Sequence, residues 1–170
     1  LRIAYLFESS GLIDFFNGIY GNIDTEIALV VDNMPGMASP SAPWLKRVGE
    51  FKQHVGLPVF HAARITDIAT ARYAITENLL DMVAMTRAHI ADPQIVNKLV
   101  AGQEDRIRPC VGATHCMSAN RPTCLPNPAP GGEHKLPHMN MSSDQRTRRV
   151  VMGGAGPADL DGKRGVGGGG

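Results

Sequence analysis

The sequence Pro-Val-Phe-His-Ala-Ala-Arg-Ile-Thr-Asp, residues 58–67, decides the fold class. Its first half is a short apolar run, typical of a buried strand, and its second half is a turn that leads into an amphipathic segment. Thr66 stands where it would cap a helix. The apolar face of that helix is formed by Ile68, Ala71, Ile75 and Leu79, which recur at helical spacing. A strand that passes directly into a helix is one unit of a parallel α/β fold.

The same order is repeated on both sides of this unit. A strand is expected at 12–20, after a Ser-Ser-Gly break at 9–11, and its helix runs from Trp44 to the stop at Gly56. A further strand is expected at 81–85. Its helix has Asp92 as N-cap and ends at Gly102. We therefore predict three parallel strands, 12–20, 57–62 and 81–85, side by side with their helices on one face.

Composition excludes two classes of partner. The formal net charge is +1 over 170 residues, so no strong field attracts nucleic acid or anionic lipid. No apolar run reaches the roughly 18 residues that span a bilayer, and no signal peptide is present, so a cytoplasmic location is expected. The chain begins with Leu1 and enters what resembles the end of a helix, which favours a fragment of a longer protein.

Three cysteines, Cys110, Cys116 and Cys124, lie in one short stretch, and the rest of the chain has none. Clustered cysteines in a cytosolic protein indicate metal more than disulfides, although the Cys-x5-Cys-x7-Cys spacing matches no common zinc pattern and three free thiols stay possible. The surrounding segment, 109–147, is rich in proline and glycine and offers few apolar anchors. A metal or cluster is therefore the expected staple of this segment.

Three pieces of the sequence resemble a known family: residues 58–67, the Asp-Met-Val-Ala-Met-Thr-Arg-Ala-His-Ile-Ala-Asp-Pro stretch at 81–93, and Arg-Ile-Arg-Pro-Cys-Val-Gly at 106–112. They are similar to the old yellow enzyme relatives that carry an iron-sulfur cluster, including trimethylamine dehydrogenase, 2,4-dienoyl-CoA reductase and N-methylproline demethylase. The resemblance implies an α/β fold in which these units are the last three of a TIM barrel, with strands 6 to 8 present and strands 1 to 5 missing.

The resemblance also implies an FMN phosphate site at the ends of the last two strands, where barrels usually hold phosphate. Ala63, Arg64, Thr86 and Arg87 would cradle the phosphate, with Arg87 giving a charge-assisted fork. Relatives usually have glycine at the position of Ala63.

The aromatic residues of the first strand divide between its two faces. Alternation places Phe16, Gly18 and Tyr20 together, opposite Phe15. We expect Phe15 to pack in the core. Phe16 and Tyr20 either help wall a pocket for a small N-methylated amine or pack in the core, which is the more common place for aromatic residues on a barrel strand. The family's other acid and base groups lie on the missing strands, so no catalytic residue is assigned.

In the relatives, a Cys-x2-Cys-x2-Cys run and a fourth cysteine about a dozen residues later hold a 4Fe-4S cluster. Cys110, Cys116 and Cys124 match the first, third and fourth positions, and Ala113 occupies the second. Three thiolates could hold a 3Fe-4S cluster, or a 4Fe-4S cluster whose last iron takes His115 or water. Zinc bound by the three cysteines and one histidine is the alternative.

The resemblance divides the chain into three regions. Residues 1–108 are expected to be the end of the FMN barrel, 109–147 the iron-sulfur segment, and 148–170 the truncated start of an FAD or NAD domain with a glycine-rich tail. The Gly-Ala-Gly-Pro-Ala turn at 154–158 resembles a dinucleotide fingerprint, but Asp159 stands where the third glycine belongs. FAD or NAD binding is thus expected only in a complete parent protein.

The function implied is that of an FMN-dependent oxidoreductase that N-demethylates a small methylated amine or amino acid. The alternatives are an NAD(P)H-dependent reductase of enoates or 2,4-dienoyl-CoA, and an inactive fragment whose cysteine loop binds zinc or nothing. The expected partner of the enzyme is a small-molecule substrate, and a second copy of the chain or an electron-transfer protein is a further candidate.

Overall fold

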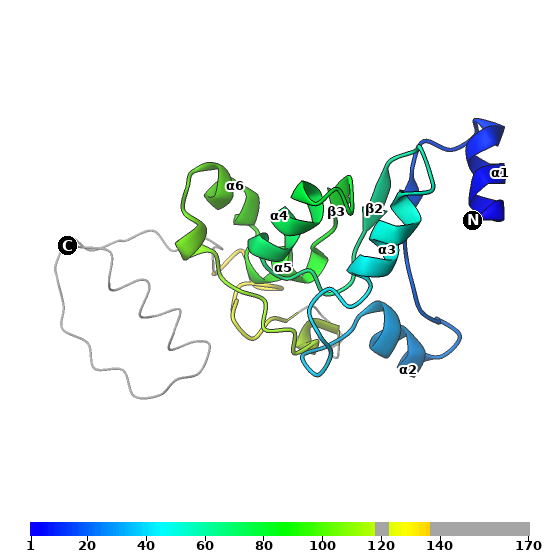
Figure 1. The fold of residues 1–170 in the computed structure, drawn as a ribbon. Coiled ribbons are helices and arrows are strands. Elements are labelled where there is room, and N and C mark those ends of the chain that lie inside the picture. The colour runs from blue at the N-terminus through cyan, green and yellow to red at the C-terminus, as the bar shows by residue number, and fades with distance from the viewer. Residues whose placement is uncertain (118–122, 137–170) are drawn as a thin grey trace. The chain divides into compact units, whose positions relative to one another are not determined.

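The computed structural model describes residues 1–117 and 123–136, and the chain divides into two compact units, 1–87 and 88–170. The elements of the first unit, in chain order, are α1 (Arg2–Ser10), β1 (Phe16–Asn17), α2 (Glu26–Ala28), the π-helical turn η1 (Leu29–Asn33), α3 (Leu45–Lys52), β2 (Val59–His61), α4 (Ile68–Thr76) and β3 (Met82–Val83) (Figure 1). Helix α5 (Thr86–Ala91) begins at the boundary. The second unit continues with α6 (Ile95–Val100) and the 3-10 turns η2 (Glu104–Arg106) and η3 (His115–Met117).

The sheet has three parallel strands in the order β1-β2-β3, as the sequence predicts. Phe16 is paired with Val59, and Phe60 with Met82. Each strand is shorter than its predicted range. In β1 the ladder ends at the hydrogen bond from the Gly18 N–H to the Phe60 carbonyl, 2.8 Å, because the chain then turns back on itself.

The core of the first unit lies between the sheet and the helices α3 and α4. Val48 of α3, Val59 of β2 and Ala74 of α4 are each completely buried, and Leu80 is 1% exposed. Burying a Val or Leu side chain contributes about 1.5–3 kcal/mol. These contacts fix the two helices against the face of the sheet on which Val59 lies.

The prediction that Phe15 packs in the core is wrong, whereas Phe16 and Tyr20 take the core alternative. Phe16 meets Phe51 of α3 edge to face at 5.3 Å, and Tyr20 stacks on Trp44 at 6.1 Å, so both pack against the core. Phe15 is 48% exposed and stacks on Phe60 at 4.5 Å on the opposite face. The alternation is as predicted, but α3 covers the face of Phe16.

Two predicted helix caps differ in the structure. Asp67 caps α4 by accepting from the Thr70 N–H at 2.7 Å, so the cap is one residue later than Thr66. Helix α6 begins at Ile95 with Gln94 as its N-cap residue. The Asp92 carboxylate accepts from the Gln94 N–H at 3.0 Å, so it closes the turn that precedes α6, and Pro93 lies in this turn and not in the helix.

The segment between β1 and α3 is more ordered than the predicted loop. It contains α2 and η1, and its end is held by the Trp44 indole N–H, which donates to the Asp32 carbonyl at 2.8 Å. The Asp32 carboxylate accepts from the Asn22 N–H at 3.0 Å. These bonds hold the connection on both sides of the segment 34–36. Its proline and glycine content conceals this order at the sequence level.

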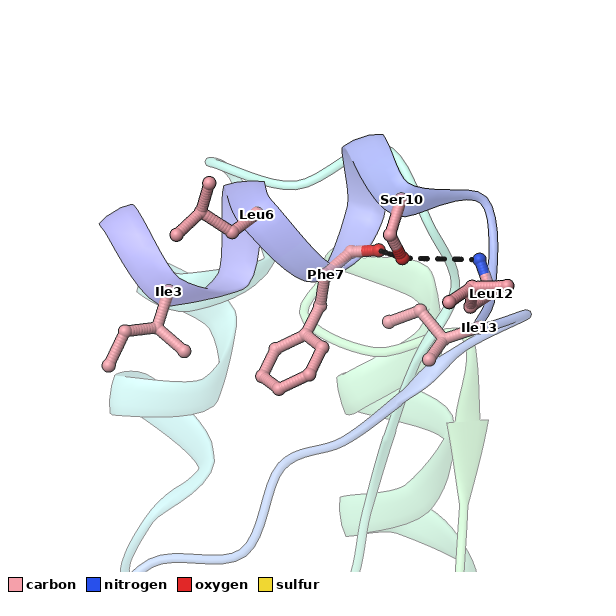
Figure 2. Close-up of a pocket in the computed structure, with 6 residues that line it drawn as sticks. All are labelled: Ile3, Leu6, Phe7, Ser10, Leu12 and Ile13. Carbon is pink, nitrogen blue, oxygen red and sulfur yellow. Dashed lines mark hydrogen bonds between the residues drawn. The ribbon is translucent and has the colours of Figure 1, made fainter.

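Helix α1 carries an apolar pocket of about 390 Å³ on the N-terminal side of β1. Figure 2 shows its lining residues, which are Ile3, Leu6, Phe7, Ser10, Leu12 and Ile13. The Ser10 hydroxyl closes the helix end by donating to the Phe7 carbonyl and accepting from the Leu12 N–H. Gly11 follows in the left-handed conformation with φ of 66°, which confirms the predicted break.

In the described part of the chain, no helix has the length and apolar character needed to cross a membrane. The predicted dinucleotide stub, 148–170, lies outside the described residues.

Candidate functional site

The turn after β2 is the most strained backbone of the first unit. Ala63 has φ of 115° and Arg64 has φ of 52°, two consecutive non-glycine residues in the left-handed half of conformational space. Such a residue costs about 1–3 kcal/mol and persists only where the surroundings impose it. The backbone at Ala63 therefore has a conformation that favours glycine, which is the residue that the relatives usually have at this position.

This turn leaves several donors without acceptors. Within the described residues, no acceptor pairs with the backbone N–H of Ala63 or of Arg64. The Nε of Arg64 is likewise buried without a partner there. Successive N–H groups at a left-handed turn form a concave anion site, and buried donors without partners are rare in folded proteins.

Two arginines converge on one short segment of the β1–α3 connection. Arg64 Nη1 donates to the Gly36 carbonyl at 2.5 Å, and Arg87 Nη1 donates to the Pro35 carbonyl at 3.0 Å. Each guanidinium has five N–H donors, so these bonds use only part of its capacity. The structure thus brings Arg64 and Arg87 to the same place, although the sequence separates them by two elements.

The other predicted cofactor ligands adjoin this pair. Ala63 precedes Arg64 in the strained turn, and Thr86 is the exposed first residue of α5, next to Arg87. All four residues belong to the first unit. The apolar pocket at α1 is lined by a different set of residues and includes none of them.

His61 lies beside this turn, at the end of β2, and is 1% exposed. Its Nδ1 contacts the Gly18 carbonyl at 2.5 Å, and because a carbonyl only accepts, Nδ1 carries the proton. Nε2 is then a buried acceptor with no partner among the described residues. Burial lowers the pKa of His61, against the weaker opposing effect of the hydrogen bond with Gly18. The imidazole is therefore held neutral.

The three cysteines are free, half-buried thiols of the second unit. Burial raises the pKa of the Cys124 thiol, a hydrogen bond from the Asn127 backbone opposes this, and the charges of Cys110 and Cys116 raise the pKa further. Cys110 and Cys116 therefore each lie within electrostatic range of Cys124. The described residues contain no group of three His, Cys, Asp or Glu side chains arranged to hold a metal ion. Thr123, next to Cys124, has a buried hydroxyl with no partner in the same part of the chain.

Two buried polar residues beside the cysteines were missed by sequence reasoning. Asp92 is 2% exposed and accepts three hydrogen bonds, and Asn127 is 1% exposed and bonds to the backbone of α5. The sequence predicts Asp92 as a helix cap, and Asn127 stands in a proline-rich run that predicts a loop. The signal available in the sequence was a carboxylate and an amide directly before prolines, which is also typical of ordinary turns.

The sequence of the chain is similar to those of flavin-dependent enzymes. No family model matches the chain. It is 53% identical over 164 residues to the "Multifunctional alkene reductase/demethylase OYE" of Caballeronia cordobensis, a match that covers 96% of this chain. It is 43% identical over 168 residues to the "Probable N-methylproline demethylase" of Rhizobium meliloti, again over 96% of the chain.

The chain belongs to the old yellow enzyme-like flavin oxidoreductases. It spans about a quarter of the length of these curated relatives, 24% in both cases. Among solved structures, it superimposes on the 6-hydroxypseudooxynicotine amine oxidase of Pseudomonas geniculata with a TM-score of 0.63 and 25% sequence identity, over 78% of this chain and 19% of that protein. These matches confirm the predicted family, and the names of the two curated relatives are those of oxidoreductases.

Proposed function

We propose that this chain supplies the FMN phosphate site and the electron-transfer segment of an enzyme that oxidatively demethylates a small N-methylated amine or amino acid. In this proposal the three strands are the last three of a TIM barrel, and residues 109–147 follow as the cluster segment. The FAD or NAD domain that begins at 148 is completed only in a longer parent chain.

The observation that carries the proposal is the set of unused donors around the turn after β2. The N–H groups of Ala63 and Arg64 and the Arg64 Nε have no acceptor within the described residues, and the Arg87 guanidinium converges on the same segment as that of Arg64. A dianionic phosphate accepts several such bonds, and charge-assisted bonds are the stronger ones. These residues fit the phosphate of FMN.

Bound FMN would supply the acceptor for the hydride lost by the substrate. The residues of this chain would bind the FMN phosphate and orient the flavin. The turn at 63–64 would donate backbone N–H groups to the phosphate, and Arg87 would add positive charge. The segment 34–36 holds both guanidinium groups in place through its carbonyl oxygens.

The cysteine segment fits an iron-sulfur cluster by its donor chemistry. Soft thiolates are the ligands of such clusters, and Cys110 and Cys116 each lie within electrostatic range of Cys124. The Thr123 hydroxyl offers a donor for a cluster sulfide. With Ala113 in the second ligand position, we propose a 3Fe-4S cluster, or a 4Fe-4S cluster with His115 or water on one iron. Zinc is the alternative occupant.

The substrate class is inferred from the relatives. The Caballeronia protein is named for both alkene reduction and demethylation, and the Rhizobium protein is named for demethylation of N-methylproline. Demethylation is common to both names, so we propose it first. Reduction of an activated alkene is the second candidate, supported by the first name.

A chimera tests this proposal. The aligned residues of the Caballeronia relative are replaced by those of this chain, giving a full-length protein that we call the chimera. We expect it to retain FMN more tightly than riboflavin, and to release formaldehyde from N-methylproline. Equal retention of the two flavins would contradict the phosphate site, whereas alkene reduction without formaldehyde release would favour the second candidate.

A further inference from the structure

We propose that Asp92 and Asn127 are positioning residues that hold the two ends of the cysteine segment in place before any metal binds. This inference rests on the proposed function in one respect, namely that Cys110 and Cys124 are ligands of the metal centre. The geometry of the anchoring is independent of which metal is bound.

Asp92 fixes the entry to the segment. Its Oδ2 accepts from the Arg108 backbone N–H at 2.8 Å and from Lys98 Nζ at 2.5 Å, and its Oδ1 accepts from the Gln94 N–H at 3.0 Å. Burial alone would raise the pKa of Asp92, but the bonds from Lys98, Arg108 and Gln94 outweigh it and lower the pKa. The carboxylate is therefore an ionised, buried acceptor that holds the backbone N–H of Arg108, which stands two residues before Cys110.

Asn127 fixes the exit. Its Nδ2 donates to the Ile90 carbonyl at 2.9 Å, and its Oδ1 accepts from the Ala129 N–H at 3.1 Å. The backbone N–H of Asn127 also hydrogen bonds to the sulfur of Cys124, three residues earlier. The side chain thus places the N–H that contacts a predicted ligand.

Both ends meet at the same three consecutive residues, 90–92. Asn127 binds the Ile90 carbonyl, Arg108 Nη1 donates to the Ala91 carbonyl at 3.2 Å, and the Arg108 N–H binds the Asp92 carboxylate. We call residues 90–92 the α5 anchor. The chain before Cys110 and the chain after Cys124 are therefore both bound to this anchor.

Two buried polar residues of this kind are costly unless fully paired, and pairing them with the backbone makes their positions specific. Residues around a metal site that hold its ligands in this way typically change metal affinity ten- to a hundred-fold when replaced. The α5 anchor also explains how the cysteine segment is ordered although it has few apolar side chains. Its buried hydrogen bonds stabilise the segment in addition to the expected thiolate ligation.

The test compares Asn127→Ala and Asp92→Asn with the matched controls Asn97→Ala and Asp105→Asn, which replace exposed residues of the same types. The whole chain is kept reduced and metal-free. Dibromobimane fluoresces when it links two neighbouring thiols, and monobromobimane reports single thiols. We expect both anchor variants to lose dibromobimane linkage while keeping single-thiol reactivity, and to bind Co²⁺ on the order of ten- to a hundred-fold more weakly.

Wild-type linkage and Co²⁺ affinity in the folded anchor variants would overturn the inference. If the variants do not fold, hydrogen exchange of the metal-free wild type decides: the Arg108 and Asn127 amides should be as protected as those of 90–92, and unprotected exchange would overturn it. Should iron fail to enter the wild-type chain, the proposed function fails, whereas the linkage and exchange results still test the anchor.

Discussion

Arg87 Nη1 donates to the Pro35 carbonyl at 3.0 Å, one residue before the Gly36 carbonyl that accepts from Arg64. The guanidinium groups of the two arginines of the proposed phosphate site, one in the turn after β2 and one in α5, are therefore both held by the connection after β1. A change in segment 34–36 would alter the position of both guanidinium groups together. Replacing either arginine would remove a donor to the phosphate and also a hydrogen bond to segment 34–36.

The first prediction separates those effects. In the chimera, Arg87→Ala should weaken FMN binding by about 1.5–3 kcal/mol, the value of a hydrogen bond to a charged group, because it removes a donor to the phosphate. Riboflavin lacks the phosphate, so its affinity should stay unchanged. Quenching of flavin fluorescence measures both affinities.

Arg72→Ala, on the exposed side of α4, is the matched control and should change neither affinity. An equal loss for FMN and riboflavin would show that Arg87 acts only through segment 34–36.

The second prediction concerns backbone strain at Ala63. Ala63→Gly should raise the free energy of unfolding by about 1 kcal/mol, because glycine relieves a strain of about 1–3 kcal/mol while adding about 0.4–1 kcal/mol of unfolded-state entropy. Ala62→Gly gains no such relief, since Ala62 has no positive φ, and should destabilise. Urea denaturation of the chain measures both, and a destabilising Ala63→Gly would contradict the strain.

The third prediction is a pH dependence caused by His61. Its pKa is lowered in the folded chain, so between that value and the unfolded value of about 6.5 the unfolded chain binds more protons. The free energy of unfolding should therefore fall as the pH drops below about 6.5, by at most about 1.4 kcal/mol per pH unit. Urea denaturation between about pH 5 and 7, roughly the titration range of histidine, measures how the free energy of unfolding changes with pH.

His61→Asn retains a donor for the Gly18 carbonyl but does not titrate, so it should flatten the slope. His54→Asn, at an exposed histidine, should keep it. A slope that persists in His61→Asn would assign it to another group.

The fourth prediction concerns the missing thiolate. Ala113→Cys should raise the iron content per chain after anaerobic reconstitution and convert the spectrum towards that of a 4Fe-4S cluster, because it restores the fourth thiolate. Val111→Cys adds a thiol off the ligand pattern and should not. Iron and sulfide analysis with visible and electron paramagnetic resonance spectra measures this, and zinc without iron in both proteins would favour the zinc alternative.

The sequence predicts the elements of the sheet but not which face they bury. Alternation correctly groups Phe16 with Tyr20 and opposes them to Phe15. Which group is covered depends on where α3 packs, and that is a tertiary contact between Phe16 and Phe51 with no local signal. For this reason the sequence leaves two roles open for Phe16 and Tyr20 and places Phe15 wrongly in the core.

The site residues show a similar division. The resemblance located the turn at 63–64, but its hydrogen-bonding partners lie nearly 30 residues earlier, in a segment whose proline and glycine content predicts a plain loop. Asp92 looked like a cap because caps and buried acceptors use the same side chain. Only the fold brings the Arg108 N–H within reach of it.

The α5 anchor has a consequence for how this region can vary among sequences. Two of its three attachment points are the carbonyl oxygens of Ile90 and Ala91, which any amino acid carries, so substitutions there are limited only by packing. The third is the Asp92 carboxylate, for which no other side chain has the same length, charge and two acceptors. Mutational tolerance should therefore change abruptly between positions 91 and 92, although both residues are equally hidden from water.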